Sequence, residues 1–237
     1  MREKLLRDPV HDLIVFDLDR EEDRLLLELI DCPEFQRLRR IRQTGMAYLA
    51  FHGAEHSRFA HSIGVLHLVR RMLEKLEPRT EPVAPLARVA LQCAGLLHDI
   101  GHGPFSHVIE QFFGRRHEEW TKRIVRSPQT RVHERLVAFD PALPDLVVDA
   151  LDGKLKPGWL NFLLSSQLDA DRFDYLLRDS MMTGVKYGVF DLERLLLMLR
   201  VTEDGARLAV AAKGLLPVEK YLQSRYHMYR QVYFHKT

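Results

Sequence analysis

The residues best suited to chemistry are three histidines and an aspartate at positions 98–107. His98 and Asp99 are adjacent, and His102 and His107 follow across a Gly-His-Gly-Pro break where backbone can approach a ligand closely. A neutral imidazole beside an ionised carboxylate is a mixed nitrogen and oxygen donor set, which suits Mn²⁺, Fe²⁺, Mg²⁺ or Zn²⁺. A capped helix end would explain a bare His-Asp pair but not three histidines around two glycines. We therefore predict a divalent-metal site in this stretch.

Such a site needs ligands from several helices, because one helix face offers only partners three or four residues apart. His61 and Asp171 are the further candidates, each on a helix of its own. With His98 and Asp99 they supply two imidazoles and two carboxylates, and they leave positions for water or a phosphate oxygen. Each residue is a weak signal alone, and the four together indicate one metal centre.

Hydrophobic periodicity predicts a mainly α-helical protein, a single helical core with short β-hairpins. Residues 13–16 are expected to form a strand, and residues 199–210 a hairpin that turns at Glu203-Asp204-Gly205. Residues 121–158 are expected to hold several amphipathic helices separated by prolines. The other helices are expected over residues 22–30, 31–43, 56–76, 86–97, 159–179, 192–199 and 218–233.

The composition excludes several classes of protein. The chain has 237 residues, 46% of them hydrophobic, which suffices for a substantial core. No apolar run approaches the ~20 residues that span a bilayer, and the N-terminus has no apolar signal segment. Cys32 and Cys93 form no CxxC pair and are expected as reduced core residues, and a net charge of +2 gives no general nucleic-acid signal. We expect a cytoplasmic protein without a membrane partner.

Four arginines lie within six positions, at 37, 39, 40 and 42. Such a row usually forms a solvated face of a helix. Because guanidinium groups bind phosphate well, the row is also a candidate site for a phosphorylated ligand.

His61, the pair His98-Asp99, and Asp171 resemble the H…HD…D signature of the HD-domain phosphohydrolases. Within them the chain is most similar to the deoxynucleoside triphosphate triphosphohydrolases, which include the SAM-and-HD-domain protein and bacterial dGTPases. The resemblance runs from about residue 8 to the end and depends on residues 35–39, 56–65, 97–107 and 169–179. It implies one HD-type domain over residues 1–237 with its core at about 50–180. Relatives usually continue further, so the C-terminal extension of the family is expected to be absent or truncated.

The resemblance also implies a role for each matching residue. The metal ligands would be His61, His98, Asp99 and Asp171. His102 and His107 would orient the attacking water and contact the α-phosphate, and His117 with Glu118 would protonate the leaving 5′-oxygen. The phosphates would be contacted by Arg58, Arg172, Arg225 and Lys236. The sugar would be recognised by Gln43, Tyr175 and Asp179.

The spacing of Asp171, Tyr175 and Asp179 places all three on one helix face, four residues apart. A tyrosine ring against the sugar leaves no room for a 2′-hydroxyl, and the carboxylate can accept a hydrogen bond from the 3′-hydroxyl. This arrangement would select deoxyribose. The simpler alternatives are a core position for Tyr175, a helix-end contact for Asp179 and a surface position for His117.

The sequence therefore indicates a metal-dependent dNTP triphosphohydrolase that releases a deoxynucleoside and inorganic triphosphate. The alternatives are an HD-domain nuclease or nucleotide phosphatase, and a nucleotide-sensing or nucleic-acid-binding module. The resemblance also implies a homo-oligomer. It places a candidate site for an activating nucleotide at the arginine row near Asp31, and single-stranded nucleic acid is a further candidate partner.

Overall fold

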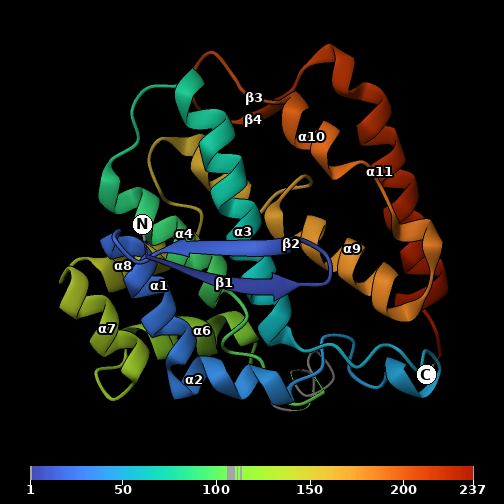
Figure 1. The fold of residues 1–237 in the computed structure, drawn as a ribbon, viewed down its shortest axis with the longest axis horizontal. Helices are drawn as coiled ribbons and strands as arrows, with labels where there is room; N and C mark the ends of the chain where they lie inside the picture. The colour runs from blue at the N-terminus through green and yellow to red at the C-terminus, as the bar shows by residue number, and fades with distance from the viewer. Residues whose placement is uncertain (1, 106–109, 111, 113, 237) are drawn as a thin grey trace.

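The computed structural model describes residues 2–105, 110, 112 and 114–236, and it is built mainly of helices around one hydrophobic core (Figure 1). The predicted mainly α-helical fold with short hairpins is confirmed. The described strands form two antiparallel pairs, β1 (Glu3–Asp8) with β2 (Asp12–Asp17) and β3 (Leu199–Val201) with β4 (Leu208–Val210). The described α-helices are α1 (Glu21–Asp31), α2 (Pro33–Gln36), α3 (Arg58–Leu76), α4 (Pro85–Leu97), α6 (His117–Arg126), α7 (Arg131–Phe139), α8 (Leu143–Leu151), α9 (Ala170–Thr183), α10 (Leu192–Met198) and α11 (Leu215–Met228). Short 3₁₀ turns lie at Arg37–Arg40, Ala47–Leu49, Glu77–Arg79, Gly158–Leu163, Lys186–Gly188 and Ala212–Gly214, and a π-helical turn at Tyr229–Tyr233.

Helix α3 is the central element, and it runs through the middle of the molecule in Figure 1. It packs against both α4 and α9, and α4 packs in turn against α8. Residues 89–97 of α4 are all buried, and apart from Gln92 they are apolar residues or glycine, as expected for a helix packed on every side. The helices predicted over residues 56–76, 86–97 and 192–199 and the hairpin over 199–210 are confirmed to within two residues.

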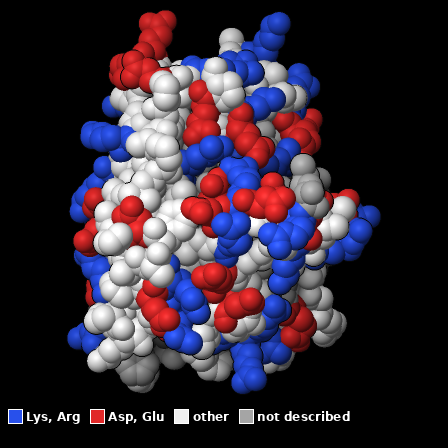
Figure 2. Space-filling view, turned by 60° about the vertical axis from the view of Figure 1, so that its left-hand side comes forward, with Lys and Arg blue, Asp and Glu red and all other residues white. Residues whose placement is uncertain are grey.

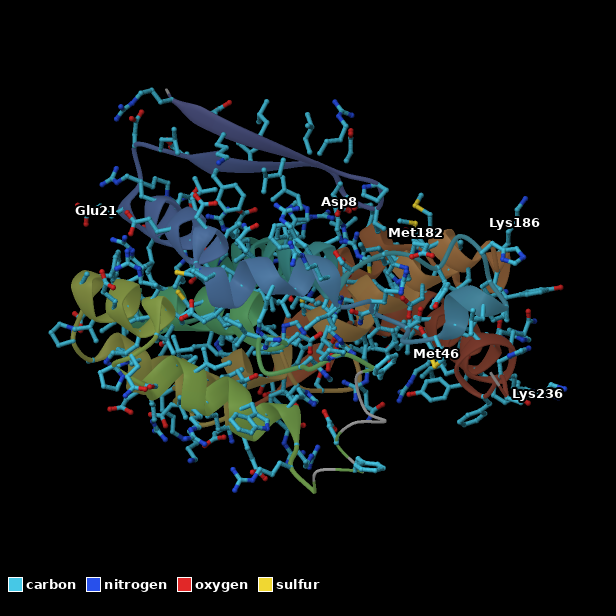
Figure 3. The ribbon with its side chains drawn as sticks, turned by 90° about the horizontal axis from the view of Figure 1, so that it is seen from below. Asp8, Glu21, Met46, Met182, Lys186 and Lys236 are labelled. Carbon is cyan, nitrogen blue, oxygen red and sulfur yellow. The ribbon has the colours of Figure 1, made fainter. Side chains whose placement is uncertain are left out.

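The N-terminal hairpin β1–β2 lies across α3, with its turn end next to α9 (Figures 1 and 3). Ile14 and Phe16 are buried, whereas Leu13 and Val15 are exposed, as expected for a strand with one face on the core. The guanidinium of Arg70 on α3 stacks over the Phe16 ring at 5.0 Å. Apolar packing therefore holds the body of the hairpin, and its turn carries Asp8 toward the centre of the molecule.

The single helix predicted over residues 159–179 is wrong in its first half. A 3₁₀ turn at Gly158–Leu163 and a break precede α9, which begins at Ala170. The cause is Asp169, whose carboxylate accepts hydrogen bonds from the backbone N–H groups of Arg172 at 2.8 Å and Ser166 at 2.7 Å. An aspartate that satisfies the free N–H groups of a helix start is a strong N-cap. Asp171 consequently lies in the first turn of α9.

The helix predicted over residues 31–43 also ends early, because α2 stops at Gln36 and a 3₁₀ turn follows. Arg37 turns inward and donates hydrogen bonds to the backbone carbonyls of Ile100 and His102. Burial lowers the pKa of Arg37 from its ordinary value. Arg37 therefore supports the chain just after the His-Asp pair, while the other three arginines of the row are exposed.

The surface and the cysteines agree with a folded domain. No helix within the described residues is long and apolar enough to cross a membrane. On the face drawn in Figure 2, basic and acidic side chains are interspersed. Cys32 and Cys93 are buried, and burial raises the pKa of their thiols to about 11 and about 12. Both cysteines are thus protonated core residues.

Candidate metal centre

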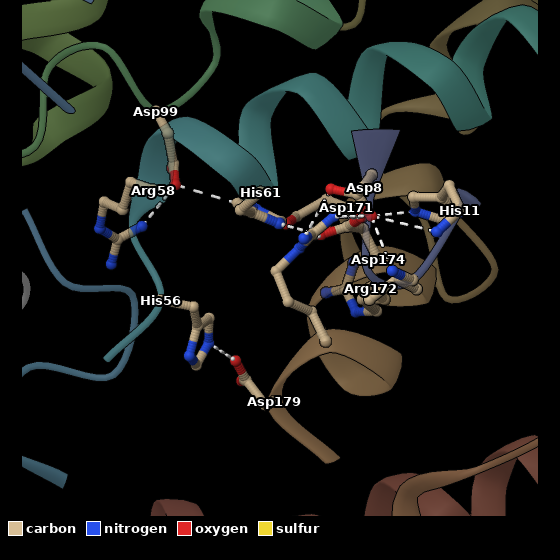
Figure 4. Close-up of polar contacts among 12 residues, drawn as sticks. Asp8, His11, His56, Arg58, His61, Asp99, Asp171, Arg172, Asp174 and Asp179 are labelled. Atoms are coloured by element: carbon tan, nitrogen blue, oxygen red, sulfur yellow. Dashed lines mark hydrogen bonds and ion pairs between the residues drawn. The ribbon is translucent and has the colours of Figure 1, made fainter. Parts of the chain in front are cut away.

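Three segments of the chain bring the four predicted metal ligands together, and Figure 4 shows three of them, His61, Asp99 and Asp171. His61 lies on α3, His98 and Asp99 follow α4 directly, and Asp171 lies in the first turn of α9. His61 Nε2 is 3.1 Å from Asp171 Oδ1 and 3.9 Å from Asp99 Oδ2. His98 Nε2 is 3.5 Å from Asp99 Oδ1 and 3.9 Å from Asp171 Oδ1. Donor atoms that share a cation at about 2.1 Å lie about 3–4 Å from one another, so this spacing fits a single divalent ion.

His98 meets the requirement of a ligand that presents its Nε2 atom. Its Nδ1 donates a hydrogen bond to the backbone carbonyl of Gly95 at 2.8 Å, which fixes the proton on Nδ1 and the lone pair on Nε2. His98 Nε2 is buried and has no hydrogen-bond partner among the described residues. A buried, unpartnered imidazole nitrogen is costly unless a ligand occupies it, so this atom supports a metal at this point.

His61 is oriented by a carboxylate behind it, Asp174. Asp174 Oδ2 lies 2.7 Å from His61 Nδ1, and this contact turns Nε2 toward Asp171. Burial opposes ionisation of Asp174, but Arg178 and the hydrogen bonds from His11 and His61 hold its pKa well below its usual range. An ionised Asp174 accepts the Nδ1 proton of His61, which is how metal-binding histidines are usually oriented.

Without a cation, His61 keeps a proton on each ring nitrogen. Burial lowers its pKa, but hydrogen bonds to Asp171 and Asp174 outweigh burial and raise the pKa to about 10. A bound divalent ion would take the place of the Nε2 proton, since a metal requires the neutral imidazole. The site is thus already built to hold positive charge at that atom.

Asp99 connects the metal centre to a buried arginine. The Arg58 guanidinium donates to Asp99 Oδ2, and His102 Nε2 lies 3.3 Å from Asp99 Oδ1. Burial raises the pKa of Asp99, but Arg58, His98 and His102 together lower it well below the usual value. Arg58 is itself buried at the start of α3, so a cation is fixed within reach of any anion bound at this centre.

Two stacked imidazoles, His102 and His117, lie beside the metal ligands. Their ring centroids are 3.7 Å apart, and His117 Nδ1 is 2.5 Å from Glu110 Oε1. Burial lowers the pKa of His102 to about 4, so its imidazole is neutral near pH 7. Donor atoms of Asp99, His102 and His117 lie within 4.8 Å of one another, which makes them a second group able to contact a cation or an anion.

Of the other two predicted catalytic residues, only Glu118 can be placed. It lies in the first turn of α6, where Oε2 is 3.7 Å from His117 Nδ1 and Oε1 pairs with Arg116 at 2.7 Å. His107 lies outside the described residues.

Comparison with known proteins fits this geometry. A family model for the HD domain matches residues 58–150, which contain His61, His98 and Asp99. The fold is similar to the crystal structure of a phosphohydrolase from Bacteroides thetaiotaomicron, with a TM-score of 0.86 and 36% sequence identity, over 99% of this chain and 55% of that one. Residues 58–150 thus match the HD domain, and the whole chain resembles the fold of a phosphohydrolase. The resemblance inferred from the sequence is thereby confirmed.

Two relatives align with almost the whole length of this HD-domain protein. YwfO of Bacillus subtilis, an uncharacterized protein, is 45% identical over 98% of this chain and 52% of its own length. The deoxynucleoside triphosphate triphosphohydrolase SAMHD1 of Danio rerio is 31% identical over 99% of this chain and 42% of its own length. The chain thus spans about half the length of the curated relatives it matches.

In this HD-domain protein, Arg172 and Arg225, both predicted to bind phosphate, contact the adjacent residues Ser166 and Gln167. The Arg172 guanidinium donates to the Asp169 carboxylate and to the Ser166 carbonyl, and Arg225 Nη1 donates to the Gln167 side chain at 2.7 Å. A pocket of about 470 Å³ opens there. Its lining includes Arg172, Ser165, Ser166, Gln167, Phe162 and Leu208. Arg172 therefore lines a concave surface next to the first turn of α9, and Arg225 contacts Gln167, another residue of its lining.

Gln43 and Lys236 lie on two segments that meet. The Gln43 carbonyl accepts a 3.4 Å hydrogen bond from Arg58, and its side-chain oxygen is buried without a partner among the described residues. The C-terminus, next to Lys236, lies beside the segment around Ala47–Leu49 in Figure 1, and the rings of Phe51 and His235 are 5.6 Å apart. The C-terminal turn thus closes against the loop that carries Gln43.

Tyr175 and Asp179 face this C-terminal turn from α9. The ring of Tyr233 meets the Tyr175 ring edge-on at 5.9 Å, and its hydroxyl donates to Asp179 Oδ2 at 2.6 Å. His56 Nε2 lies 2.6 Å from Asp179 Oδ1. Asp179 therefore has a protein partner on each oxygen, and the remaining lone pairs of the carboxylate would have to receive a sugar hydroxyl.

Sequence analysis missed the residues behind the metal ligands, Asp8, His11, Asp174 and Arg178. One signal was available, because Asp174 stands three residues after Asp171 and so lies on nearly the same face of α9. No sequence pattern indicated that Asp8 or His11 would reach that helix.

Proposed function

We propose that this protein is a metal-dependent dNTP triphosphohydrolase. It would hydrolyse the bond between the α-phosphorus and the 5′-oxygen and release a deoxynucleoside and inorganic triphosphate. The observation that supports it most is the convergence of His61, His98, Asp99 and Asp171 beside buried Arg58. A relative named as a deoxynucleoside triphosphate triphosphohydrolase, SAMHD1 of Danio rerio, matches over 99% of this chain.

The four ligands would hold a divalent ion, with Mn²⁺, Fe²⁺, Mg²⁺ and Zn²⁺ as candidates. When bound, such an ion polarises a phosphoryl oxygen and lowers the pKa of water. A triphosphate carries about four negative charges, so Arg58, Arg172, Arg225 and Lys236 would share its binding and stabilise charge on the transferring phosphoryl group.

Three histidines would orient the attacking water and transfer a proton in the reaction. Neutral His102, with His107, would accept a hydrogen bond from the attacking water and orient it toward the α-phosphorus. Glu110 Oε1 contacts His117 Nδ1 and fixes the orientation of its ring, so His117, with Glu118 nearby, would deliver a proton to the leaving 5′-oxygen. The water oxygen would bond to the α-phosphorus as the bond from phosphorus to the 5′-oxygen breaks. One proton would go to the 5′-oxygen of the deoxynucleoside, and the other would leave the triphosphate for the solvent.

Sugar selection would depend on the face of α9 that carries Tyr175 and Asp179. The Tyr175 ring would exclude a 2′-hydroxyl, and Asp179 with Gln43 would bind the 3′-hydroxyl. The tight packing of Tyr175 against Tyr233 supports this role, because a fixed ring discriminates by size more sharply than a mobile one.

The remaining assignments are part of the same proposal. We take residues 1–237 as one HD-type domain with a core at about 50–180, cytoplasmic and homo-oligomeric. An activating nucleotide would use the exposed arginines of the row, Arg39, Arg40 and Arg42, since Arg37 already supports the loop after Asp99. Single-stranded nucleic acid is a weaker candidate for the same cations.

The first test is identification of products by mass spectrometry. The protein would be incubated with an equal mixture of dNTPs, NTPs and a short single-stranded DNA, with Mn²⁺ or Mg²⁺ and with a chelator control. We expect deoxynucleosides and intact triphosphate from dNTPs alone, and none with the chelator. Shortened DNA or released phosphate, with dNTPs untouched, would replace the proposal with a nuclease or phosphatase.

A double variant separates catalysis from binding. His98→Ala with Asp99→Ala should abolish turnover while the protein stays folded, and His52→Ala, a change at an exposed histidine outside the site, should leave turnover unchanged. Nucleotide binding and biological function that survive fully in the double variant would instead support a sensor.

A further inference from the structure

We propose that Asp8 and His11, at the turn of the N-terminal hairpin, are positioning residues for the metal ligand His61, acting through Asp174 and Arg178. The inference rests on the metal centre of the proposed function and is independent of which nucleotide is hydrolysed. It assigns to the hairpin a role in the chemistry that its position in the sequence does not suggest.

Asp174 is the junction of this network, which Figure 4 shows in part. Its Oδ2 lies 2.7 Å from His61 Nδ1 and accepts from Arg178 Nε at 2.8 Å. Its Oδ1 lies 2.7 Å from His11 Nε2 and accepts from Arg178 Nη2 at 2.8 Å. Asp174 and Arg178 are fully buried. Each carboxylate oxygen thus has two donors. His11 and Arg178 together fix the orientation of the carboxylate that His61 contacts.

Asp8 fixes the hairpin turn to this junction. Its carboxylate accepts from Arg178 Nη1 at 2.9 Å and Nη2 at 3.2 Å. The same carboxylate accepts from the backbone N–H groups of Val10 at 2.9 Å and His11 at 3.0 Å. Asp8 therefore holds the turn in the conformation that directs the buried His11 side chain at Asp174.

The charges in the network suit a metal ligand. Two buried carboxylates, Asp8 and Asp174, face one guanidinium, Arg178, so the network contributes about one negative charge behind His61. A carboxylate on the far nitrogen of an imidazole raises its basicity and fixes its ring orientation. The contact from His11 Nε2 at 2.7 Å aligns that carboxylate.

Packing at Gly64 shows how closely α3 approaches this network. A Cβ atom on Gly64 would lie 1.8 Å from Asp174 Oδ1 and 2.5 Å from Arg178 Nη2. Only a glycine at position 64 leaves room for Asp174 and Arg178 to lie against α3. His61 stands three residues before Gly64 on the same helix.

A purely structural role is the alternative. The hairpin, however, already packs through Ile14 and Phe16, and buried ion pairs usually contribute little net stability compared with apolar packing. Those contacts give no reason for three charged side chains and His11 to connect to the predicted metal ligand His61. An orienting role accounts for them.

The test uses His11→Ala, His11→Gln and Asp8→Asn, with two matched controls. Arg7→Ala changes an exposed residue of the same hairpin, whose partner is exposed Asp12. Val132→Ala removes buried volume from α7, which carries none of the network residues. It controls for a general loss of folding stability. For each protein we would measure melting without metal, Mn²⁺ affinity by calorimetry and the visible absorption spectrum of bound Co²⁺, which reports ligand geometry.

We expect His11→Ala and Asp8→Asn to weaken Mn²⁺ binding about 10–100-fold and to alter the Co²⁺ spectrum. His11→Gln, which places an amide N–H where His11 Nε2 lies, should recover most of the affinity. Both controls should bind Mn²⁺ like the wild type, although Val132→Ala melts earlier. Unchanged affinity and spectrum in His11→Ala, with only a Val132→Ala-like loss of melting temperature, would overturn the proposal. Wild-type protein that binds Mn²⁺ but leaves dNTPs intact would overturn the proposed substrate alone.

Discussion

Single atoms decide whether this centre can bind a metal, because each imidazole must present the correct nitrogen. His98 does so through a bond from Nδ1 to the Gly95 carbonyl, and His61 through Asp174. The two partners are chemically different, a neutral carbonyl and an ionised carboxylate. The orientation of His61 therefore depends on a side chain that can be replaced, whereas that of His98 depends on the backbone.

His67 gives the protein a pH-dependent stability. Burial, reinforced by the charges of His11 and Arg71, lowers the pKa of His67 to about 4, whereas the unfolded histidine titrates near 6.5. Between these values the unfolded chain binds the proton more readily, so the free energy of unfolding falls as the pH drops from about 6.5 to about 4. The full effect is about 3 kcal/mol.

His67→Gln should flatten this dependence, since glutamine does not titrate. Urea unfolding at several pH values between about 7 and 4.5 would measure it. His52→Gln, at an exposed histidine, should keep the wild-type slope. Equal slopes in all three proteins would contradict the assignment to His67.

Tyr175 is expected to determine the choice of sugar. Tyr175→Ala would open space for a 2′-hydroxyl and reduce the preference for dATP over ATP by on the order of tenfold or more. The ratio of kcat/KM values for the two nucleotides measures the effect. Tyr226→Ala, at an exposed tyrosine of α11, is the control and should keep the wild-type ratio. An unchanged ratio in Tyr175→Ala would return Tyr175 to the role of a core residue.

At the scale of elements, the contact between α3 and α9 matters most, because each helix carries one metal ligand. Gly64→Ala would force Asp174 and Arg178 away from α3. We expect a loss of about 2–3 kcal/mol or more in the free energy of unfolding, together with weaker metal binding.

Gly95→Ala in α4 is the matched control for that change. Its Cβ would lie 3.0 Å from Val69 Cγ2, a contact that a small shift relieves, and alanine favours a helix by about 1 kcal/mol. Gly95→Ala should therefore change stability by about 1 kcal/mol at most. Denaturant unfolding measures the free energy of unfolding of both variants. Similar losses of stability in Gly64→Ala and Gly95→Ala would refute the role given to Gly64.

At the scale of the whole molecule, the metal centre joins segments distant in sequence, α3, the end of α4 and the start of α9. A ligand that binds only the folded state stabilises it, by about 2.7 kcal/mol at a concentration of 100 times Kd. For a chain of this size that corresponds to about 5–10 °C in Tm. Removing metal with a chelator should lower Tm by this amount in the wild type. It should leave Tm unchanged in the His98→Ala, Asp99→Ala double variant, and a chelator effect of equal size there would place the stabilising ion elsewhere.

Much of the helical fold was predictable because the spacing of apolar residues is a local property. The stripe Ile63, Leu66, Val69, Leu73 predicted α3, and the mostly apolar run of α4 predicted a buried helix. The two wrong helices have different causes, one local and one long-range. The Asp169 cap interrupts a continuous helical pattern, and Arg37 leaves its helix face for two backbone carbonyls more than sixty positions away.

The sequence by itself determined the candidate donor residues of the proposed metal centre and the helices near them, since residue type and periodicity are properties of short stretches. Only the tertiary structure decided which groups orient those donors. His11 and Asp174 are 163 positions apart, and Asp8 and Arg178 are 170 apart, and no local pattern encodes such pairs. They meet because burial of the hairpin's apolar face carries its turn against α9, where unpaired charges could not remain.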